Sequence, residues 1–169
     1  LGNFAFEAMK RQLAHKDKVA YMEQPEDLGK TKQDRIPGHR PGSMWQFPQH
    51  AQLMDLPGVV SAAFAQLDFG SDSVKPTRLL MKTSGPLHPE MYTGPPVFDE
   101  AGWYMGPLPR KEGVPLIGKV NGVFKTSEAA AWPPRLCEWV AEQVLTSFKQ
   151  NSEAGESQEG RSEEHTSEL

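Results

Sequence analysis

The chain has 169 residues, of which 37% are hydrophobic and 24% are charged, and its formal net charge is −4. This composition is typical of one globular domain with a packed core, and it argues against a wholly disordered chain. The charge does not make the body acidic, because residues 151–169 carry six Glu and one Arg while the remainder is close to neutral. Bulk electrostatics therefore neither favour nor exclude a nucleic-acid partner.

Cysteine content and hydropathy narrow the cellular location. The single cysteine, Cys137, cannot form an internal disulfide or a cysteine-rich metal site, which is typical of a reducing compartment. No apolar run is long enough to span a bilayer, and the first residues lack the order of a signal peptide. We therefore predict an intracellular protein, nuclear or cytoplasmic, without a membrane partner. The oligomeric state is left open by these features.

The two ends of the chain suggest a reading frame that is truncated on both sides. It begins at Leu1, already within a predicted helix, and residues 161–169, RSEEHTSEL, resemble the translation of a sequencing-library adapter. Residues 151–160 are polar and rich in Gly, Ser and Glu, which predicts disorder. We therefore expect one domain over residues 1–150 and a disordered tail over residues 151–169.

The first third of the body predicts a helix, a strand and a second helix. Asn3 to Lys16 has apolar residues at helical spacing, and Val19 to Met22 is a short apolar run suited to a buried strand. Residues 30–42 are polar and rich in Gly and Pro, which predicts a loop. Ser43 is then a good N-cap for a helix that Pro48 must kink or restart. A strand entered from a helix favours an α/β arrangement.

The next segment predicts strands joined by turns. Val59 to Phe69 and Arg78 to Lys82 are apolar and β-branched or aromatic enough to form strands, and we expect them to pair as a hairpin. Residues 83–115 are rich in proline and predicted to be mostly irregular, with a short hairpin around Ala101-Gly102. Asn121-Gly122 is a strong signal for a further hairpin.

The last predicted element is an amphipathic helix from Pro133 to Phe148, with proline in its first turn. Its apolar side is expected to carry Leu136, Trp139, Val140, Val144 and Leu145.

Three motifs occur in the order and spacing of a known family. They are EQPEDLG at residues 23–29, FGSDSVKPTRLL at residues 69–80 and TSEAAAWPPRLCEWVA at residues 126–141. Over residues 3–148 the chain resembles the C-terminal half of DNA methyltransferase-like proteins related to the cytosine-5 methylases, of the phage, algal and fungal transposon-associated type. The resemblance implies an α/β fold with part of a Rossmann-like methyltransferase sheet, S-adenosylmethionine as cofactor in the complete protein only, and DNA as partner.

The resemblance assigns a role to Glu23, which ends the predicted strand. In a doubly wound sheet, ligands bind at the carboxyl ends of the strands, so this carboxylate would lie at the rim of the cleft. In cytosine-5 methylases the corresponding glutamate hydrogen-bonds the ring of the flipped cytosine, and a protonatable acid suits that task. Glu23 is thus the candidate catalytic residue; the alternative is a local cap or pair. Glu26 and Asp27 could accept hydrogen bonds, with a solvated acidic turn as the alternative.

Four further residues are candidates for contacts with the substrate or nucleic acid. Gln24 follows the candidate acid, although the family usually has Asn there, and Gln66 precedes Leu67, where relatives commonly have Cys. Lys75 and Arg78 flank the KPT turn and could contact phosphates. The alternative for Lys75 is a solvated residue at a strand edge.

The last motif suggests where the cofactor would bind. In cytosine-5 methylases, the matching segment of small residues and prolines opens a helix beside S-adenosylmethionine. Here this resemblance assigns Ala130, Ala131 and Trp132 to the cofactor, while the alternative is a helix that merely closes the sheet. Cys137 on that helix is expected to be a small buried residue.

No metal site is predicted. Arg110 to Gly113 stand where many relatives have a Cys-Gly-His cluster, and neither Cys nor His is present among them. His39, His50 and His88 lack the spacing of metal ligands, so solvated surface positions are expected for all three.

The resulting interpretation is part of an S-adenosylmethionine-dependent DNA (cytosine-5) methyltransferase-like protein. The 169 residues contain neither the glycine-rich cofactor turn nor the Pro-Cys nucleophile of that class, so this chain alone is expected to be inactive. The alternative is a noncatalytic module of a mobile-element polyprotein that binds nucleic acid or protein. A different enzyme on the same half-sheet is a third possibility, because fold does not determine chemistry.

Overall fold

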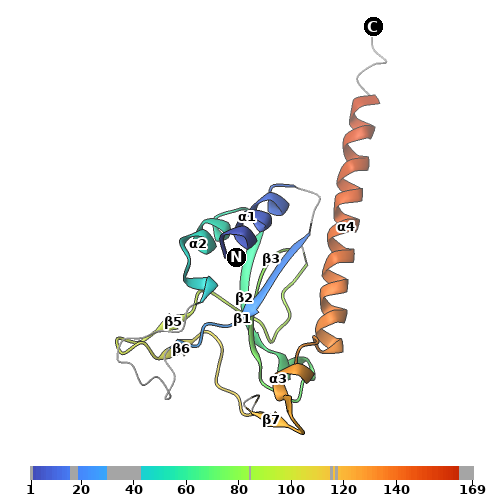
Figure 1. The fold of residues 1–169 in the computed structure, drawn as a ribbon. Helices are drawn as coiled ribbons and strands as arrows, with labels where there is room; N and C mark the ends of the chain where they lie inside the picture. Colours follow the sequence, from blue (N-terminus) through green and yellow to red (C-terminus); the bar gives the residue numbers. More distant parts are fainter. Residues whose placement is uncertain are drawn as a thin grey trace.

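The fold is mixed α/β and is built on a four-stranded antiparallel sheet (Figure 1). The computed structural model describes residues 2–15, 19–29, 43–83, 85–114, 116 and 118–163. The predicted loop over residues 30–42 lies outside this part of the chain, and so does His39.

The spatial order of the sheet is β1 (Ala20–Pro25), β3 (Pro76–Lys82), β2 (Val59–Ala65) and β4 (Tyr92–Thr93). The predicted hairpin of two strands is confirmed by β2 and β3, although residues 66–69, predicted as the end of the first strand, form a 3₁₀ turn instead. Because β3 is antiparallel to both β1 and β2, these two strands point in the same direction although β3 lies between them. Their carboxyl ends therefore meet at one end of the sheet, beside the start of β3.

The first strand is longer than predicted. It does not stop at Glu23 but continues through Gln24 to Pro25, because pairing with β3 persists as far as Pro25 opposite Thr77. The carboxylate of Glu23 is therefore carried on the sheet itself, opposite Leu79, rather than on the loop that follows.

Helices cover both faces of the sheet (Figure 1). Helices α1 (Gly2–Leu13) and α2 (Pro48–Met54) lie over one face, and α4 (Pro134–Glu163) lies over the other. The first face buries a cluster made of Phe6, Met9, Leu13, Ala20, Trp45, Leu53, Val59 and Leu80. The second buries Ala62, Phe64, Phe69, Leu79, Met81, Met91, Leu136 and Trp139. Side chains alternate along a strand, so each strand contributes to both cores.

The turn and cap chemistry predicted for the second helix is confirmed. The Ser43 hydroxyl accepts a hydrogen bond from the Trp45 amide at 3.2 Å and so caps a 3₁₀ turn, η1 (Met44–Gln46). Pro48 then begins α2, which is the predicted restart.

Short hairpins make up most of the region between the sheet and α4. Strands β5 (Val97–Phe98) and β6 (Tyr104–Gly106) confirm the hairpin around Ala101-Gly102. Strands β7 (Lys119–Val120) and β8 (Val123–Phe124) confirm the second one. Asn121 and Gly122 have φ values of 51° and 81°, as a tight two-residue turn requires. Two short helical turns, η2 (Gln66–Phe69) and α3 (Lys125–Glu128), complete the fold.

The last helix differs from the prediction in two ways. It continues to Glu163 instead of ending at Phe148, so the tail expected to be disordered over residues 151–169 is helical over residues 151–163. This segment contains no proline and is rich in Glu and Gln, which favour helix. Leu145, assigned to the apolar side, is 60% exposed, because it lies on a different side of the helix from Gln143 and Ser147, which are buried.

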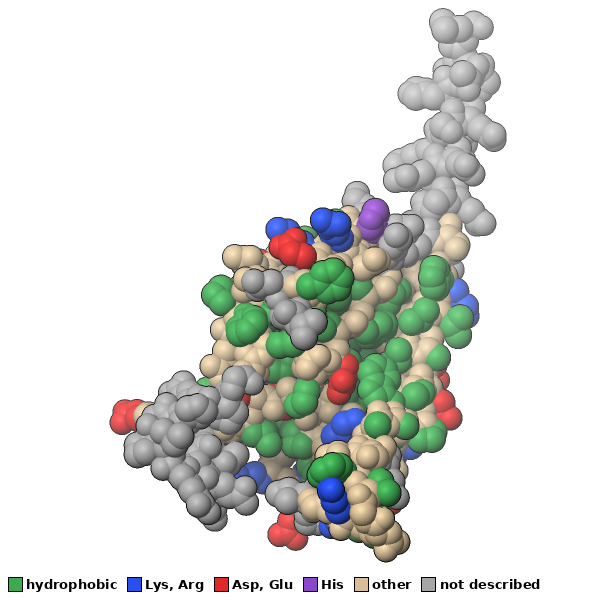
Figure 2. Space-filling view, viewed as in Figure 1, with side chains coloured by type: hydrophobic (Ala, Val, Ile, Leu, Met, Phe, Trp, Pro, Cys, Tyr) green, Lys and Arg blue, Asp and Glu red, His purple; other side chains and the backbone are tan. Residues whose placement is uncertain are grey.

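Figure 2 shows apolar side chains along α4 and the adjoining layer, with most charged side chains at the margins of this face. The described residues include no helix that is both long enough and apolar enough to cross a membrane.

Candidate active site at one end of the sheet

The predicted site residues converge at the end of the sheet where β1 and β2 finish and β3 begins. Strand pairing sorts them onto two faces. Glu23 is opposite Leu79, whose side chain packs beneath α4, whereas Gln24 is opposite Arg78 on the face covered by α1 and α2. The residues expected to form one site therefore form two clusters separated by the sheet.

Glu23 lies on the α4 face and is half-buried. Burial raises the pKa of its carboxyl, and the positive charge of Lys75 opposes this effect. A carboxyl that holds its proton to a higher pH than usual can act as a hydrogen-bond donor or general acid. The pKa direction suits the role predicted for Glu23, whereas its position within β1 differs from the strand end that was predicted.

Lys75 lies in the turn before β3, and both its side chain and its backbone make hydrogen bonds. Its ammonium group donates a hydrogen bond of 2.6 Å to the carbonyl of Ala129, 54 residues later. Its own carbonyl accepts from the Thr77 hydroxyl at 2.9 Å. Lys75 has φ of 33°, a conformation uncommon outside glycine. The side chain therefore reaches across to the segment before α4 instead of extending into solvent as a strand-edge lysine would.

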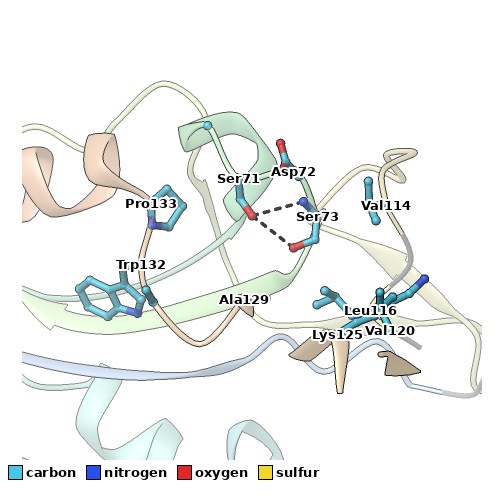
Figure 3. A pocket seen from close by; sticks show the side chains of 12 residues that line it. Ser71, Asp72, Ser73, Val114, Leu116, Val120, Lys125, Ala129, Trp132 and Pro133 are labelled. Carbon is cyan, nitrogen blue, oxygen red and sulfur yellow. Dashed lines mark hydrogen bonds between the residues drawn. The ribbon is translucent and has the colours of Figure 1, made fainter. Parts of the chain in front are cut away.

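The segment before α4 forms one wall of a cavity of about 430 Å³ (Figure 3). Ala129, Ala131, Trp132 and Pro133 lie on that wall, whereas Ala130 is exposed and is not part of the lining. The remaining lining comes from the turn after η2 and from the segment around the second hairpin, namely Gly70, Ser71, Asp72, Ser73, Val114, Leu116, Val120 and Lys125.

The lining combines apolar and polar surface. The Ser71 hydroxyl accepts a hydrogen bond of 3.3 Å from the Ser73 amide and lies 3.2 Å from the Ser73 hydroxyl (Figure 3). Trp132 and Lys125 lie on opposite sides of the cavity in this view. A cavity of this volume with an aromatic wall and a few polar groups has the character of a small-molecule site.

Arg78 has a different role from the phosphate contact predicted for it. Its side chain is fully buried, and its guanidinium makes a two-pronged ion pair with Glu26, with nitrogen–oxygen distances of 2.5 and 2.8 Å. The remaining nitrogen donates to the Ser61 hydroxyl at 3.0 Å and to the carbonyl of Gly94 at 2.7 Å. Arg78 presents no surface to solvent, so a phosphate could reach it only if this network opened.

The two acids after β1 are buried, and the solvated acidic turn considered above is wrong. The Glu26 carboxylate is 5% exposed and also accepts a hydrogen bond of 3.0 Å from the Tyr104 hydroxyl. Asp27 accepts from the Gly29 amide at 3.0 Å and from the side chain of Gln46. Gly29 has φ of 63°, and a side chain there would meet the Phe98 ring, so this position requires glycine.

The cavity lining also does not include Gln66 or Gln24. Gln66 is 1% exposed, and its amide nitrogen donates to the Thr77 hydroxyl at 3.1 Å. Gln24 is half-buried on the face of α1 and α2. Of the predicted site residues, Ala131 and Trp132 line the cavity, and Lys75 contacts its wall through Ala129. Glu23, like Gln24 and Gln66, is not part of the lining.

The prediction that His50 is a solvated surface residue is wrong. It is 6% exposed, its ring packs edge-on against Trp45, and its Nε2 lies 3.2 Å from the Ser61 hydroxyl. Burial, followed by the charge of Arg78, lowers its pKa. His88 is half-buried and its ring contacts that of Phe69, with ring centres 4.6 Å apart.

Cys137 is exposed, which is also contrary to expectation. It lies one residue after Leu136, and one residue turns a helix by about 100°, so Cys137 falls on the side away from the sheet.

Lys111 lies in the segment that stands where many relatives have a Cys-Gly-His cluster, and it forms ion pairs. The ammonium of Lys111 lies 2.5 Å from Asp68 and 3.6 Å from Glu90. Within the described part of the chain, no three His, Cys, Asp or Glu residues gather closely enough to hold a metal ion.

The Glu26 network was not foreseen. The network includes Tyr104, Ser61 and His50, and no local sequence motif predicts these contacts. One signal was available: an arginine in the apolar run RLLMK requires a buried partner, and the nearest free acids follow the neighbouring strand.

Comparison with protein-family models, with curated proteins and with solved structures finds no match for this chain. What the site can do therefore has to follow from its own chemistry.

Proposed function

We propose that this chain is part of an S-adenosylmethionine-dependent, DNA (cytosine-5) methyltransferase-like protein. The observation that carries the proposal is the placement of an acid and a cavity at the same end of the sheet, on the same face. Lys75 donates a hydrogen bond to Ala129 on the cavity wall, and its positive charge opposes the raised pKa of Glu23.

The path of the chain through the sheet supports the proposal. Strands β1 and β2 run in the same direction with β3 inserted antiparallel between them, so their carboxyl ends lie at the same end of the sheet. The helices on both faces fit such a layered fold. Ligand sites of open α/β sheets lie beyond the carboxyl ends of strands that run in the same direction, and Glu23 lies on β1 two residues before that end.

The cavity fits the proposed cofactor in size and lining. Small-molecule sites usually occupy about 300–1,000 Å³, and the cavity volume of about 430 Å³ falls in this range. Ala129 and Ala131 have short side chains that allow a ligand close to the backbone, and Trp132 offers an aromatic surface. When bound, the cofactor would supply the methyl group.

The contribution of this chain is to bind and to hold a proton. Glu23 is suited to share its proton with a ring nitrogen of the substrate, since burial favours the protonated carboxyl. Arg78 and Glu26 hold the segment after β1 in place from the opposite face. Without the glycine-rich turn and the Pro-Cys loop, this chain is expected to bind but not to transfer.

Calorimetric titration with S-adenosylmethionine tests the proposal. Ala131→Leu places a larger side chain on the cavity wall and should weaken binding by about tenfold or more, a change of about 1.4 kcal/mol. Ala141→Leu makes the same change at an exposed position of α4 and serves as the control, with unchanged affinity expected. Equal affinities for both variants, or no binding to the wild-type chain, would contradict the proposal.

A noncatalytic protein-binding module is the second candidate, and exposed apolar side chains favour it. The second hairpin exposes Val120, Val123 and Phe124 by more than half, and α4 exposes Leu145 and Phe148 similarly. Apolar groups that gather on a surface commonly mark contacts with another protein. This candidate predicts no affinity for S-adenosylmethionine, so the same titration separates the two.

A further inference from the structure

Helix α4 carries a second set of apolar side chains on the side that faces away from the sheet. The residues that face the sheet are buried, namely Leu136, Trp139, Gln143 and Ser147. The second set, here called the outer stripe, consists of Cys137, Ala141, Leu145 and Phe148, and all four are exposed. Single exposed apolar residues are common on proteins, but these four recur on one side of one helix.

The spacing of the outer stripe places its members in one line along the helix. They follow one another at intervals of four, four and three residues. Each residue turns a helix by about 100°, so the four side chains fall within about 80° of one another and extend over roughly 16 Å of the helix. Figure 1 shows the other described elements on one side of α4 only, which leaves the outer stripe open to a partner.

The order of side-chain sizes along the outer stripe identifies that partner. The small residues Cys137 and Ala141 come first, and the large residues Leu145 and Phe148 come last. In an antiparallel pair of α4 helices, Leu145 of one copy lies opposite Ala141 of the other, and Phe148 lies opposite Cys137 in the same register. A parallel pair would leave space between the small side chains and crowd the large ones, and close packing tolerates neither. The stripe is therefore complementary to a second copy of itself.

The charged residues beside the outer stripe fit the same register. Glu138 and Lys149 lie on one flank, turned from Ala141 by about 60° and 80°. Both are exposed, and neither makes an ion pair with another described residue of its own chain. A twofold axis between antiparallel helices keeps this flank on the same side of both, so Glu138 of each copy lies beside Lys149 of the other. Glu142 is turned further from the stripe, by about 100°, and lies at the margin of the contact.

We propose that two copies of this chain associate through α4, with their outer stripes packed antiparallel about a twofold axis near residues 142–143. Such a contact uses the same patch on both copies, as twofold dimers do. The patch is small, so the dimer is expected to be weak and to depend on protein concentration. The inference goes beyond the function proposed above and does not rest on it, because the outer stripe faces away from the sheet and is not part of the cavity lining.

Sedimentation equilibrium of the 169-residue chain under reducing conditions tests for the dimer. The wild-type chain should show a monomer–dimer equilibrium. Leu145→Glu places a charge inside the contact and should weaken association by about tenfold or more. Val123→Glu makes a matched change at another exposed apolar residue, in the second hairpin, and should leave association unchanged.

Disulfide formation tests the direction of packing, because Cys137 is the single cysteine of the chain. In the antiparallel register, the two copies of Cys137 lie about 16 Å apart along the helices, and a disulfide requires Cα atoms within about 7 Å. Wild-type chains oxidised with diamide should therefore remain monomeric on a denaturing gel. Phe148→Cys places a second cysteine opposite Cys137 of the other copy and should form a covalent dimer, whereas Val123→Cys should not.

Exchange of the flanking charges tests the register independently of the apolar residues. Lys149→Glu brings like charges together and should weaken association by about threefold, since exposed ion pairs contribute little. Glu138→Lys combined with Lys149→Glu restores opposite charges and should restore association.

Three results would overturn the inference. The first is a wild-type chain that stays monomeric at millimolar concentration. The second is equal association of Leu145→Glu and Val123→Glu, which would place the contact outside the outer stripe. The third is cross-linking of wild-type Cys137 as efficient as that of Phe148→Cys, which would indicate a parallel pair.

Discussion

Two acids lie three residues apart at the end of β1 and have opposite surroundings. Glu26 is buried and pairs with Arg78 through two hydrogen bonds, and it also accepts from Tyr104. Glu23 is half-buried on the other face, which α4 covers, and burial raises its pKa against the charge of Lys75. The first carboxylate is fully occupied in holding the fold, whereas the second has a raised pKa and lies on the same face of the sheet as the cavity. The difference indicates which acid is available for chemistry.

The same substitution at both positions should have the largest and most unequal effect. Glu26→Gln leaves the Arg78 charge buried without its partner and should lower the free energy of unfolding by about 3–5 kcal/mol. Glu23→Gln should change it by less than about 1 kcal/mol, since a half-exposed carboxyl loses little. Urea unfolding at neutral pH measures both values. Similar losses for the two variants would remove the distinction.

Removal of one hydroxyl tests how complete the Glu26 network is. Tyr104 donates to Glu26 at 3.0 Å and accepts from the amide of buried Leu108 at 2.9 Å. Tyr104→Phe leaves that amide without its partner and should cost about 1–3 kcal/mol in urea unfolding. An unchanged stability would mean that Tyr104 is not an essential part of the network.

The substitution Lys75→Gly tests whether the turn before β3 contributes little to stability, in contrast to the Glu26 network. Lys75→Gly loses the hydrogen bond to Ala129 but relieves the strain at φ of 33°. Because the two effects oppose each other, the free energy of unfolding should stay within about 1 kcal/mol of the wild type. A loss of more than about 3 kcal/mol would place Lys75 with the structural network instead.

The smallest expected effect is a dependence on pH. The pKa of His50 is lowered by burial and then by Arg78, so the unfolded chain binds this proton more tightly. The contribution to stability is complete above the ordinary pKa of 6.5 and is lost as the pH falls below it. One proton limits the slope to about 1.4 kcal/mol per pH unit. His50→Gln should flatten the stability profile just below pH 6.5; a profile identical to that of the wild type would contradict this.

Elements set by local chemistry could be predicted from the sequence. The Ser43 cap, the restart at Pro48 and the Asn121-Gly122 turn depend on a few neighbouring residues, and all three are confirmed. The antiparallel pair of β2 and β3 follows from two apolar runs and a turn between them.

Burial set by distant contacts could not be predicted. Glu26 meets Arg78 across 52 residues and Tyr104 across 78, so nothing near Glu26 in the sequence distinguishes it from a solvated acid. The prediction that Cys137 is buried was wrong for another reason. A shift of one residue along a helix exchanges the covered side for the exposed one.

The measurement that tests the central claim most directly is NMR shift mapping of the wild-type chain with S-adenosylhomocysteine, the product form of the proposed cofactor. The account predicts shifts confined to the residues that line the cavity, with the largest at Ala131 and Trp132 and smaller ones at Ser71 and Ser73. Shifts that occur elsewhere, or none at millimolar ligand, would contradict the assignment of this end of the sheet to the cofactor.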